Sequence, residues 1–428
     1  MSITARRATS VYGLGLPAKL GLLGCLYFSQ GLPYGFFTQS LPVILRREGM
    51  SLPNIGLTSL LAIPWALKFL WAPAVDRFGH RGFGRRKSWI VPLQGLSLAG
   101  LAGFALVCAA GGSAPITALL AFVFLLNLLS ATQDIATDGL AVAVLNKHER
   151  GCANGLQVAG YRVGMVVGGG VLLILHDYLG MSGIFVVMAC LVGLATIPVL
   201  RAHEGPPPHE DANPRAEGQF YAFFRRPSVW RVLIIIATYK FGDALAQGML
   251  RPFLVDLGLT LSDLGWVIGT VGFVAGIFGA LAGGALVNRL GRRTALLAFG
   301  LLQAAAVGAY AMLAFHPPET HVPIYAAIAF EHFAGGMATA ALFTCMMDWC
   351  GEEESATDYT IQASTVVIVS GIAAAMSGFV VEANGYGGHF FAATILSCSG
   401  LGVVFAIFPD GRAFPAEDAP IEERRLCV

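Results

Sequence analysis

The sequence contains little charge for its length. Only 12% of its 428 residues are Asp, Glu, Lys or Arg, while 56% are hydrophobic. A typical soluble domain carries about 25% charged and about 45–50% apolar residues, so this chain cannot cover a soluble globule with a polar surface. Disorder is excluded too, because disordered chains combine low hydrophobicity with high net charge. What remains is a polytopic, all-α integral membrane protein.

Charge of one sign and paired cysteines are also missing. The formal net charge is +1, so nothing indicates a nucleic-acid partner. The eight cysteines are scattered through apolar runs without a C-x-x-C spacing, and they predict neither a metal site nor a cofactor. An enzyme is not expected, because the best nucleophile–base pair, His332 and Cys345, lies thirteen residues apart on one expected helix.

Long apolar runs between polar, Gly or Pro breaks predict twelve membrane-spanning helices. In the first half of the chain they cover 18–45, 54–75, 88–110, 115–145, 152–176 and 181–200. In the second half they cover 229–253, 262–287, 294–315, 322–348, 359–381 and 388–408. We therefore expect a six-helix half at 1–200, a linker at 201–228, a second half at 229–408 and a tail at 409–428.

Lys and Arg residues outside these spans are strongly one-sided. Twenty of them fall on the side of the N-terminus and three on the other. Basic loops stay in the cytoplasm, so both termini are expected there.

A ten-residue pattern occurs twice, about half a chain apart. Residues 72–81 read APAVDRFGHR and residues 284–293 read GALVNRLGRR. The pattern resembles G-x-x-x-D-R-x-G-x-R, which marks the loop between the second and third helices in the major facilitator superfamily. This resemblance implies a transporter built from two pseudo-symmetric six-helix halves in parallel repeat.

The repeated loop is expected to act as a gate. Its candidate gating residues are Asp76, Arg77, Gly79, Arg81, Arg289, Gly291 and Arg293. The acid can face a helix N-terminus, where the dipole favours negative charge, and the arginines can pair across the two halves. The alternative is that these are ordinary positive-inside charges.

Ionisable side chains within the spans are the main candidates for function, because burying them in a membrane is costly. They are Lys68, Asp134, Asp138, Arg162, Lys240, Asp243 and Glu331, with Asp348 near a helix end. Asp134 and Arg162 reach similar depth, so they can form an ion pair, whose role can also be purely structural. Lys68, near the end of its helix, can snorkel to the surface or contact substrate.

Polar and small residues mark two further spans. Gln30, Tyr34 and their neighbours Gly31, Pro33 and Gly35 predict a break in the first span, as expected of a helix that lines a cavity. Gly160, Gly164 and Gly168 have the spacing that lets helices pack closely.

These side chains suggest two roles. We expect an anionic solute to be bound by Arg162, Lys240, Tyr34, Gln30 and Lys68. We expect the coupling proton to be carried by Asp134, Asp138, Glu331 or Asp243, since a carboxyl in a low-dielectric cavity can exchange a proton near neutral pH.

Several further runs resemble one group within the superfamily. They are FSQGLPYGFFTQSLPVILRREG (28–49), LKFLWAPAVDR (67–77), GRRKSW (84–89), ATQDIATDG (131–139), GYRVGM (160–165) and SATDYTIQAS (355–364). They are similar to the muropeptide-permease and acetyl-CoA-transporter group. That resemblance implies proton-driven uptake of a bulky solute across the bacterial inner membrane by alternating access, in a protein that works as a monomer.

Departures from the muropeptide branch bear on the substrate. That branch resembles QDI-x-x-D-A-W, whereas this chain continues with Thr137-Asp138-Gly139, and its compact length leaves no room for extra spans. With MMDW at 346–349, these features favour a siderophore-like solute. A muropeptide or acyl-CoA permease, and an exporter of the same fold, are the alternatives.

Overall fold

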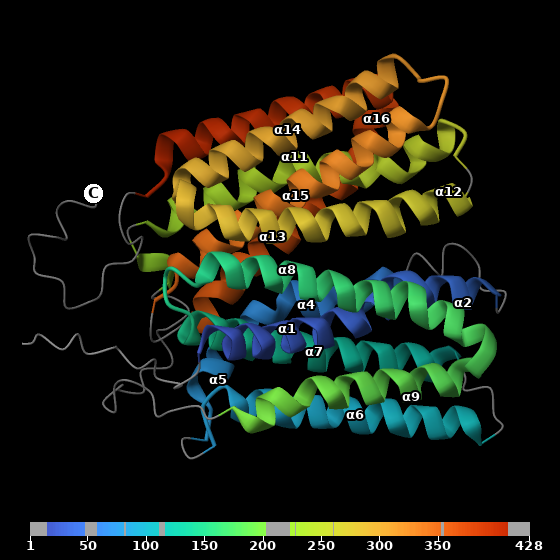
Figure 1. Cartoon of the computed structure of the whole chain (residues 1–428), viewed down its shortest axis with the longest axis vertical. Helices are drawn as coiled ribbons and strands as arrows, with labels where there is room; N and C mark the ends of the chain where they lie inside the picture. Colours follow the sequence, from blue (N-terminus) through green and yellow to red (C-terminus); the bar gives the residue numbers. More distant parts are fainter. Residues whose placement is uncertain are drawn as a thin grey trace, which may run out of the picture.

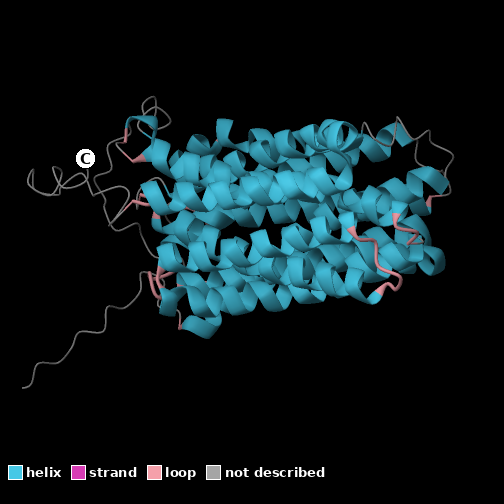
Figure 2. Cartoon of the chain, turned by 90° about the horizontal axis from the view of Figure 1, so that it is seen from above, coloured by secondary structure: helices cyan, strands magenta, loops and turns pink. Residues whose placement is uncertain are grey.

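The computed structural model describes residues 15–47, 58–80, 83–110, 116–202, 223–226, 228–259, 261–351 and 355–409. Within these ranges the chain is helical and forms no β-strand (Figure 2). The helices run side by side along one axis, and the described loops gather at the two ends of the bundle (Figure 2). Most of the predicted linker 201–228, most of the predicted tail 409–428 and Arg81 lie outside the described residues.

The first half of the chain builds one side of the bundle (Figure 1). Its α-helices are α1 (Leu16–Gly35), α2 (Leu41–Arg47), α4 (Ile63–Leu67), α5 (Ala72–Arg77), α6 (Lys87–Ala109), α7 (Ile116–Val144), α8 (Arg150–Val166) and α9 (Leu172–Arg201). Wide π-helical turns at Phe36–Ser40 and Val167–Val171 follow α1 and α8, and tighter 3₁₀ turns at Thr58–Ala62 and Lys68–Leu70 flank α4.

The second half builds the other side of the bundle (Figure 1). Its helices are α11 (Val229–Asp256), α12 (Leu261–Trp266), α13 (Phe273–Leu290), α14 (Arg292–Phe315), α15 (Val322–Asp348) and α16 (Ser355–Ile407). A π-helical turn at Val267–Gly272 joins α12 to α13.

The twelve predicted spans are present. Among the described residues, seven stretches of helix are long and apolar enough to cross a membrane. Two of these, Arg150–Arg201 and Ser355–Ile407, each hold two crossings, because the chain reverses at Gly180 (φ 65°) and Gly385 (φ 66°). Glycine adopts such a φ without steric strain. The other crossings are formed by 16–47, by 58–77 and by α11.

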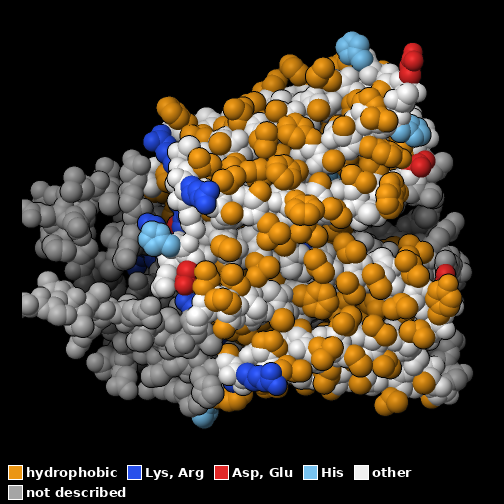
Figure 3. All heavy atoms as spheres, in the orientation of Figure 1, with side chains coloured by type: hydrophobic (Ala, Val, Ile, Leu, Met, Phe, Trp, Pro, Cys, Tyr) orange, Lys and Arg blue, Asp and Glu red, His pale blue; other side chains and the backbone are white. Residues whose placement is uncertain are grey.

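The surface of the bundle is that of a membrane protein. Hydrophobic side chains cover its middle, while charged side chains lie toward its two ends (Figure 3). Phe379 is 75% exposed and Leu106 is 72% exposed. Such wide apolar exposure is unfavourable in water but is matched by lipid.

Glycines let α1 and α8 touch along their length. A methyl group on Gly164 would lie 2.3 Å from the carbonyl oxygen of Phe28, and one on Gly168 would lie 2.0 Å from that of Leu32. This confirms the close packing predicted from the spacing of the glycines. The first span is not broken at Gln30–Gly35 as expected, because α1 continues to Gly35 and only then widens into the π-helical turn.

The second span, in contrast, is less regular than predicted. Instead of one helix over 54–75, short helices begin near Pro64 and Pro73, with a 3₁₀ turn at Lys68–Leu70 between them. Proline fits the first turn of a helix but interrupts one that is already running. Irregular backbone at membrane depth is tolerated where protein buries it, and here it carries Lys68, which is only 3% exposed.

Candidate functional site

One cluster of charges lies inside the first half, around Lys68. Its ammonium pairs with Asp134 and lies 3.9 Å from Asp138 Oδ2. The Tyr27 hydroxyl, on α1, donates a hydrogen bond of 2.9 Å to Asp138 Oδ1. Because Lys68 is buried and holds both acids, the idea that it snorkels to the membrane surface is wrong.

The expected ion pair between Asp134 and Arg162 is also wrong, because Asp134 pairs with Lys68 instead. The Arg162 guanidinium lies instead against Gly276 of α13, in the second half, within range of the charges of Glu331 on α15 and Asp243 on α11. The reason lies in the rotation of α8. Gly160 and Gly164 face α1, and a residue two positions away on a helix points to nearly the opposite side, toward the second half.

The second cluster therefore lies at the junction of the two halves. Lys240 Nζ is 2.7 Å from Asp243 Oδ2, one turn along α11. Glu331 is 3% exposed, and its Oε2 lies 2.9 Å from His332 Nδ1. Arg162 from the first half thus meets two acids whose other neighbours belong to the second half.

A glycine makes room for Arg162. A methyl group on Gly276, in α13, would lie 1.8 Å from Arg162 Nη1, and its three nearest neighbours are all atoms of that guanidinium group. On the same helix, a methyl on Gly272 would lie 2.7 Å from His332 Cδ2. The wall of α13 is therefore shaped to fit the two side chains.

An aromatic patch lies beside the Lys68 cluster. Tyr34 packs on Trp65 at 5.7 Å and on Tyr161 at 5.8 Å between ring centroids. The Lys68 ammonium sits 5.8 Å from the centre of the Trp65 ring. Gln30 is 1% exposed, and its amide atoms have no hydrogen-bond partner among the described residues. Buried amides normally have partners, so Gln30 is available to a ligand or to water.

Replacing Lys68 by methionine is expected to destabilise the protein by about 3–5 kcal/mol, because it leaves two buried acids without their cation. Thermal unfolding in detergent measures the loss. Lys147→Met, at an exposed loop position, is the control. The double variant Lys68→Met, Asp134→Asn should regain much of the stability. An equal loss of thermal stability in Lys68→Met and Lys147→Met would contradict the importance of the pair between Lys68 and Asp134.

The two halves are joined by polar contacts at one end of the bundle. We call this end the terminal face; it holds the start of α1 at Leu16 and the end of α16 at Ile407. Asp76, at the end of α5, is completely buried there and accepts a 2.6 Å hydrogen bond from the backbone N–H of Thr357, in the first turn of α16. An N-terminal turn offers free N–H groups and a dipole that favours a carboxylate.

The arginines that act at the terminal face are not the ones that the motif suggested. Arg86 lies 2.5 Å from Asp76 and reaches Ser355 in the other half. Arg77 and Arg289 are exposed, and Arg293 bonds the carbonyl of Phe405 within its own half. Expected pairing of the loop arginines across the halves is therefore wrong for these three.

The remaining motif positions have backbone roles or are exposed. Gly79 packs tightly on Arg85, with 2.8 Å between an added methyl and the Arg85 carbonyl oxygen. Gly291 adopts φ 79° between α13 and α14, a conformation that favours glycine.

Asp348 is a second link between the halves. It accepts hydrogen bonds from Arg150 Nη1 of α8 at 2.8 Å and from Arg292 Nε of α14 at 2.6 Å. Arg292 also donates to the carbonyl of Lys147 at 2.8 Å. The sequence placed Asp348 near a helix end but gave no sign that it joins two arginines from different halves.

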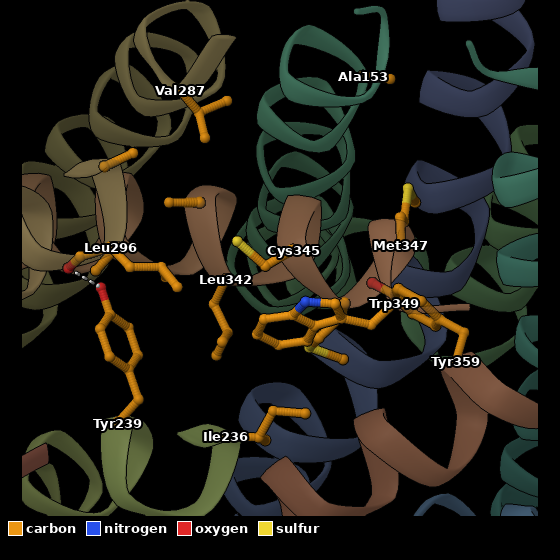
Figure 4. Close-up of a cluster of buried hydrophobic side chains, with 14 of the residues drawn as sticks. Ala153, Ile236, Tyr239, Val287, Leu296, Leu342, Cys345, Met347, Trp349 and Tyr359 are labelled. Carbon is orange, nitrogen blue, oxygen red and sulfur yellow. Dashed lines mark hydrogen bonds between the residues drawn. The ribbon is translucent and has the colours of Figure 1, made fainter. Parts of the chain in front are cut away.

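Apolar side chains seal the same end. Figure 4 shows Ala153 of α8, Val287 of α13, Cys345 of α15 and Tyr359 of α16 as members of one buried cluster. Cys345 is completely buried. We call this cluster the apolar plug; besides these four its members include Leu23, Tyr27, Ala141, Val142, Ile236, Leu342, Met346, Met347 and Trp349. The terminal face is thus closed by both charge and apolar packing.

Glu149 and Lys19 fasten α1 to the start of α8 at this face. Lys19 Nζ lies 2.7 Å from Glu149 Oε2, which also accepts the backbone N–H of Asn146. Burial would raise the pKa of Glu149, but these two donors hold that pKa below its usual range.

A carboxyl with a lowered pKa stabilises the folded protein above its ordinary pKa and loses this effect as the pH falls. Glu149→Gln should therefore lower the thermal midpoint at about pH 7 and make much less difference at about pH 4. Thermal unfolding of both proteins at the two pH values measures this. A difference that does not change with pH would contradict it.

Comparison with known proteins agrees with this architecture. The family model described as acetyl-coenzyme A transporter 1 matches residues 19–183, and that of the Major Facilitator Superfamily matches residues 238–426. The anhydromuropeptide permease of Escherichia coli K12 is 33% identical over 391 residues, which is 90% of this chain and 78% of that protein.

Solved structures share the fold. The human organic anion transporter MFSD10 aligns with a TM-score of 0.70 at 14% identity, over 91% of this chain and 100% of that one. A bacterial homologue of the iron transporter ferroportin in an outward-facing state aligns with a TM-score of 0.65 at 15% identity, over 91% and 98%.

Fold, charge clusters and relatives together define a multi-pass membrane transporter with the major facilitator fold. The chain belongs to the major facilitator superfamily, in its group of muropeptide permeases and acetyl-CoA transporters.

Proposed function

We propose that the protein imports a muropeptide-type solute together with protons across the bacterial inner membrane. The observation that carries the proposal is the position of Arg162, which reaches from the first half to Gly276 of α13 in the second, near Glu331 and Asp243. The surroundings of a side chain that reaches from one half to the other at mid-depth change when the halves move. Ligand binding to such a side chain can therefore be coupled to that movement. The 33% identity to an anhydromuropeptide permease supports the choice of solute.

Alternating access is supported by the one-sided closure. Asp76, Asp348 and the apolar plug hold the halves together at the terminal face. Loops at this face carry most of the basic residues, so we place the face and both termini in the cytoplasm. The structure then corresponds to a carrier closed toward the cytoplasm, and opening requires the two halves to rock apart as in other such transporters.

The side chains near the two charge clusters suit a solute with both sugar and peptide parts. Tyr34, Trp65 and Tyr161 offer flat aromatic faces on which a sugar ring can pack, and Gln30 offers free amide atoms. Arg162 and Lys240 can bind peptide carboxylates, in competition with the acids that hold them in the empty carrier. Arg is well suited to such bidentate contacts.

A peptide carboxylate bound by Arg162 competes with the attraction that Glu331 and Asp243 exert on the guanidinium, and so changes an electrostatic interaction between the halves. Binding therefore changes the relative stability of the closed and open states, which is the only way a ligand can shift that equilibrium. Glu331 and Asp243, together with Asp134 and Asp138, are the candidates for the coupling proton. We expect the protein to complete this cycle as a monomer.

Siderophore uptake is the alternative that the chain's own motifs favoured, but the relatives described above support a muropeptide. Acyl-CoA transport is favoured by the match of 19–183 to the acetyl-coenzyme A transporter family. An exporter of the same fold is the alternative in direction, because the symmetry of the fold does not set direction.

The test uses purified protein in liposomes with an acidic outside and a radiolabelled panel of an anhydromuropeptide, a siderophore and acetyl-CoA. We expect the muropeptide alone to accumulate, and a protonophore to abolish the accumulation. Liposomes with Arg162→Ala are the control for leakage. Accumulation of another member of the panel would identify that compound, and not the muropeptide, as the substrate. Accumulation unaffected by the protonophore would refute proton coupling.

A further inference from the structure

We infer that Asp138 is the residue that takes up and releases the transported proton. This inference deepens the proposed proton coupling but does not depend on the identity of the solute. Its basis is the way in which the buried charges share their partners.

The two charge clusters together hold more acids than bases. Three bases, Lys68, Arg162 and Lys240, are matched by four acids, Asp134, Asp138, Asp243 and Glu331. Two bases and two acids lie together in the cluster around Arg162. The surplus acid therefore belongs to the first half, where Asp134 and Asp138 share Lys68 alone.

The geometry around Lys68 decides which of the two acids is in surplus. Asp134 is in direct contact with the ammonium, whereas Asp138 Oδ2 lies 3.9 Å from it. The other partner of Asp138 is the neutral hydroxyl of Tyr27, at 2.9 Å. Two neighbouring carboxylates with one counter-ion do not both ionise readily in a dry interior, so the proton resides on Asp138.

Titratable groups from several elements face Asp138. Tyr27 comes from α1, Lys68 from the second span, and Asp134 from the same face of α7. Tyr359 of α16 interacts electrostatically with Asp138 from the other half. Arg86, which lies against the adjacent Gly139, is itself paired with Asp76. No second cation in the described chain stands in direct contact with Asp138.

The position of Asp138 links its proton to the apolar plug that closes the terminal face. Asp138 is 2% exposed and lies about 9 Å from the end of α7 at the terminal face, six residues at 1.5 Å each. Its neighbours Tyr27 and Tyr359 belong to the apolar plug and to different halves. A neutral Asp138 can stay buried between them, whereas the deprotonated carboxylate needs water, which reaches it only when the halves part.

Labelling with dicyclohexylcarbodiimide tests this inference, because the reagent modifies protonated carboxyl groups in apolar surroundings. The purified protein is treated in detergent and the modified residue is found by mass spectrometry. We expect modification at Asp138, suppressed as the pH is raised, and none in Asp138→Asn. Modification at Asp134, Asp243 or Glu331 instead, or at no buried acid, would overturn the inference.

Two variants test the shared lysine. In Asp134→Asn, Lys68 is free to pair with Asp138, so labelling of Asp138 should fall about tenfold at the same pH. In Asp256→Asn, at an exposed site near the opposite end, labelling should not change. Unchanged labelling in Asp134→Asn would contradict the charge balance. The measurement needs neither solute nor gradient, so it tests Asp138 even if uptake of every solute in the panel fails.

Discussion

Uptake by Gly276→Ala is expected to fall about 100-fold, a loss of ~3 kcal/mol, because the Arg162 guanidinium can no longer occupy its place between the two halves. The added methyl would lie 1.8 Å from Arg162 Nη1, so the guanidinium group must move from its position against α13. Folding should survive, because the methyl meets only the flexible tip of a side chain. Uptake of the labelled solute into liposomes and thermal unfolding measure the two effects.

The same helix offers a matched control. A methyl on Gly269 meets nothing within 4 Å, so Gly269→Ala should transport normally. Arg162→Ala should reproduce the defect of Gly276→Ala, and the double variant should be no worse than Arg162→Ala, since both changes remove one interaction. Additive losses would show that Gly276 acts through something other than Arg162. Normal uptake by Arg162→Ala would refute its assigned role.

Replacing Asp348 by asparagine should open the terminal face. The carboxylate is bonded to Arg150 of one half and Arg292 of the other. Hydrogen bonds to a charged group contribute about 1.5–3 kcal/mol each, so losing about 2 kcal/mol raises the open fraction about 30-fold. Cys345, one turn earlier on α15 and completely buried, is a natural reporter of opening.

The experiment follows the rate at which a membrane-permeant maleimide modifies Cys345, in a background with the other cysteines replaced by alanine. Asp348→Asn should increase that rate by a factor close to the rise in open fraction. Asp256→Asn, whose carboxylate bonds Tyr386 instead, is the control and should react at the parental rate. An unchanged rate in Asp348→Asn would mean that the apolar plug alone keeps this face closed.

Much of the fold could be predicted from the sequence, because the number of spans depends on local composition. Apolar runs of membrane length gave twelve crossings, and the repeated loop motif gave two halves. The second span shows where such reading fails. Its mean composition is that of a membrane helix, yet short helices begin near Pro64 and Pro73. The assumption of one regular helix placed Lys68 near a helix end, whereas it is buried.

The site could be predicted as a set of residues but not as a set of pairs. Several charges reach similar depth, and depth alone could not choose between Lys68 and Arg162 as the partner of Asp134. The rotation of each helix about its own axis decides which of these charges form pairs. For α8 the signal was present in the sequence, because Gly160 and Gly164 mark the face against α1 and Arg162 lies opposite. Asp348 had no comparable signal, since its partners Arg150 and Arg292 stand at the starts of two helices, α8 and α14, that are distant from it in the sequence.

The apolar plug has a thermodynamic consequence for the working cycle. In the proposed cycle, opening of the terminal face would expose side chains such as Trp349 and Met346 to water, whereas the arginines and carboxylates that separate there would regain hydration. Exposure of apolar surface raises the heat capacity, so the equilibrium between closed and open states must curve with temperature. Because apolar association weakens on cooling, the closed state loses this part of its stability in the cold.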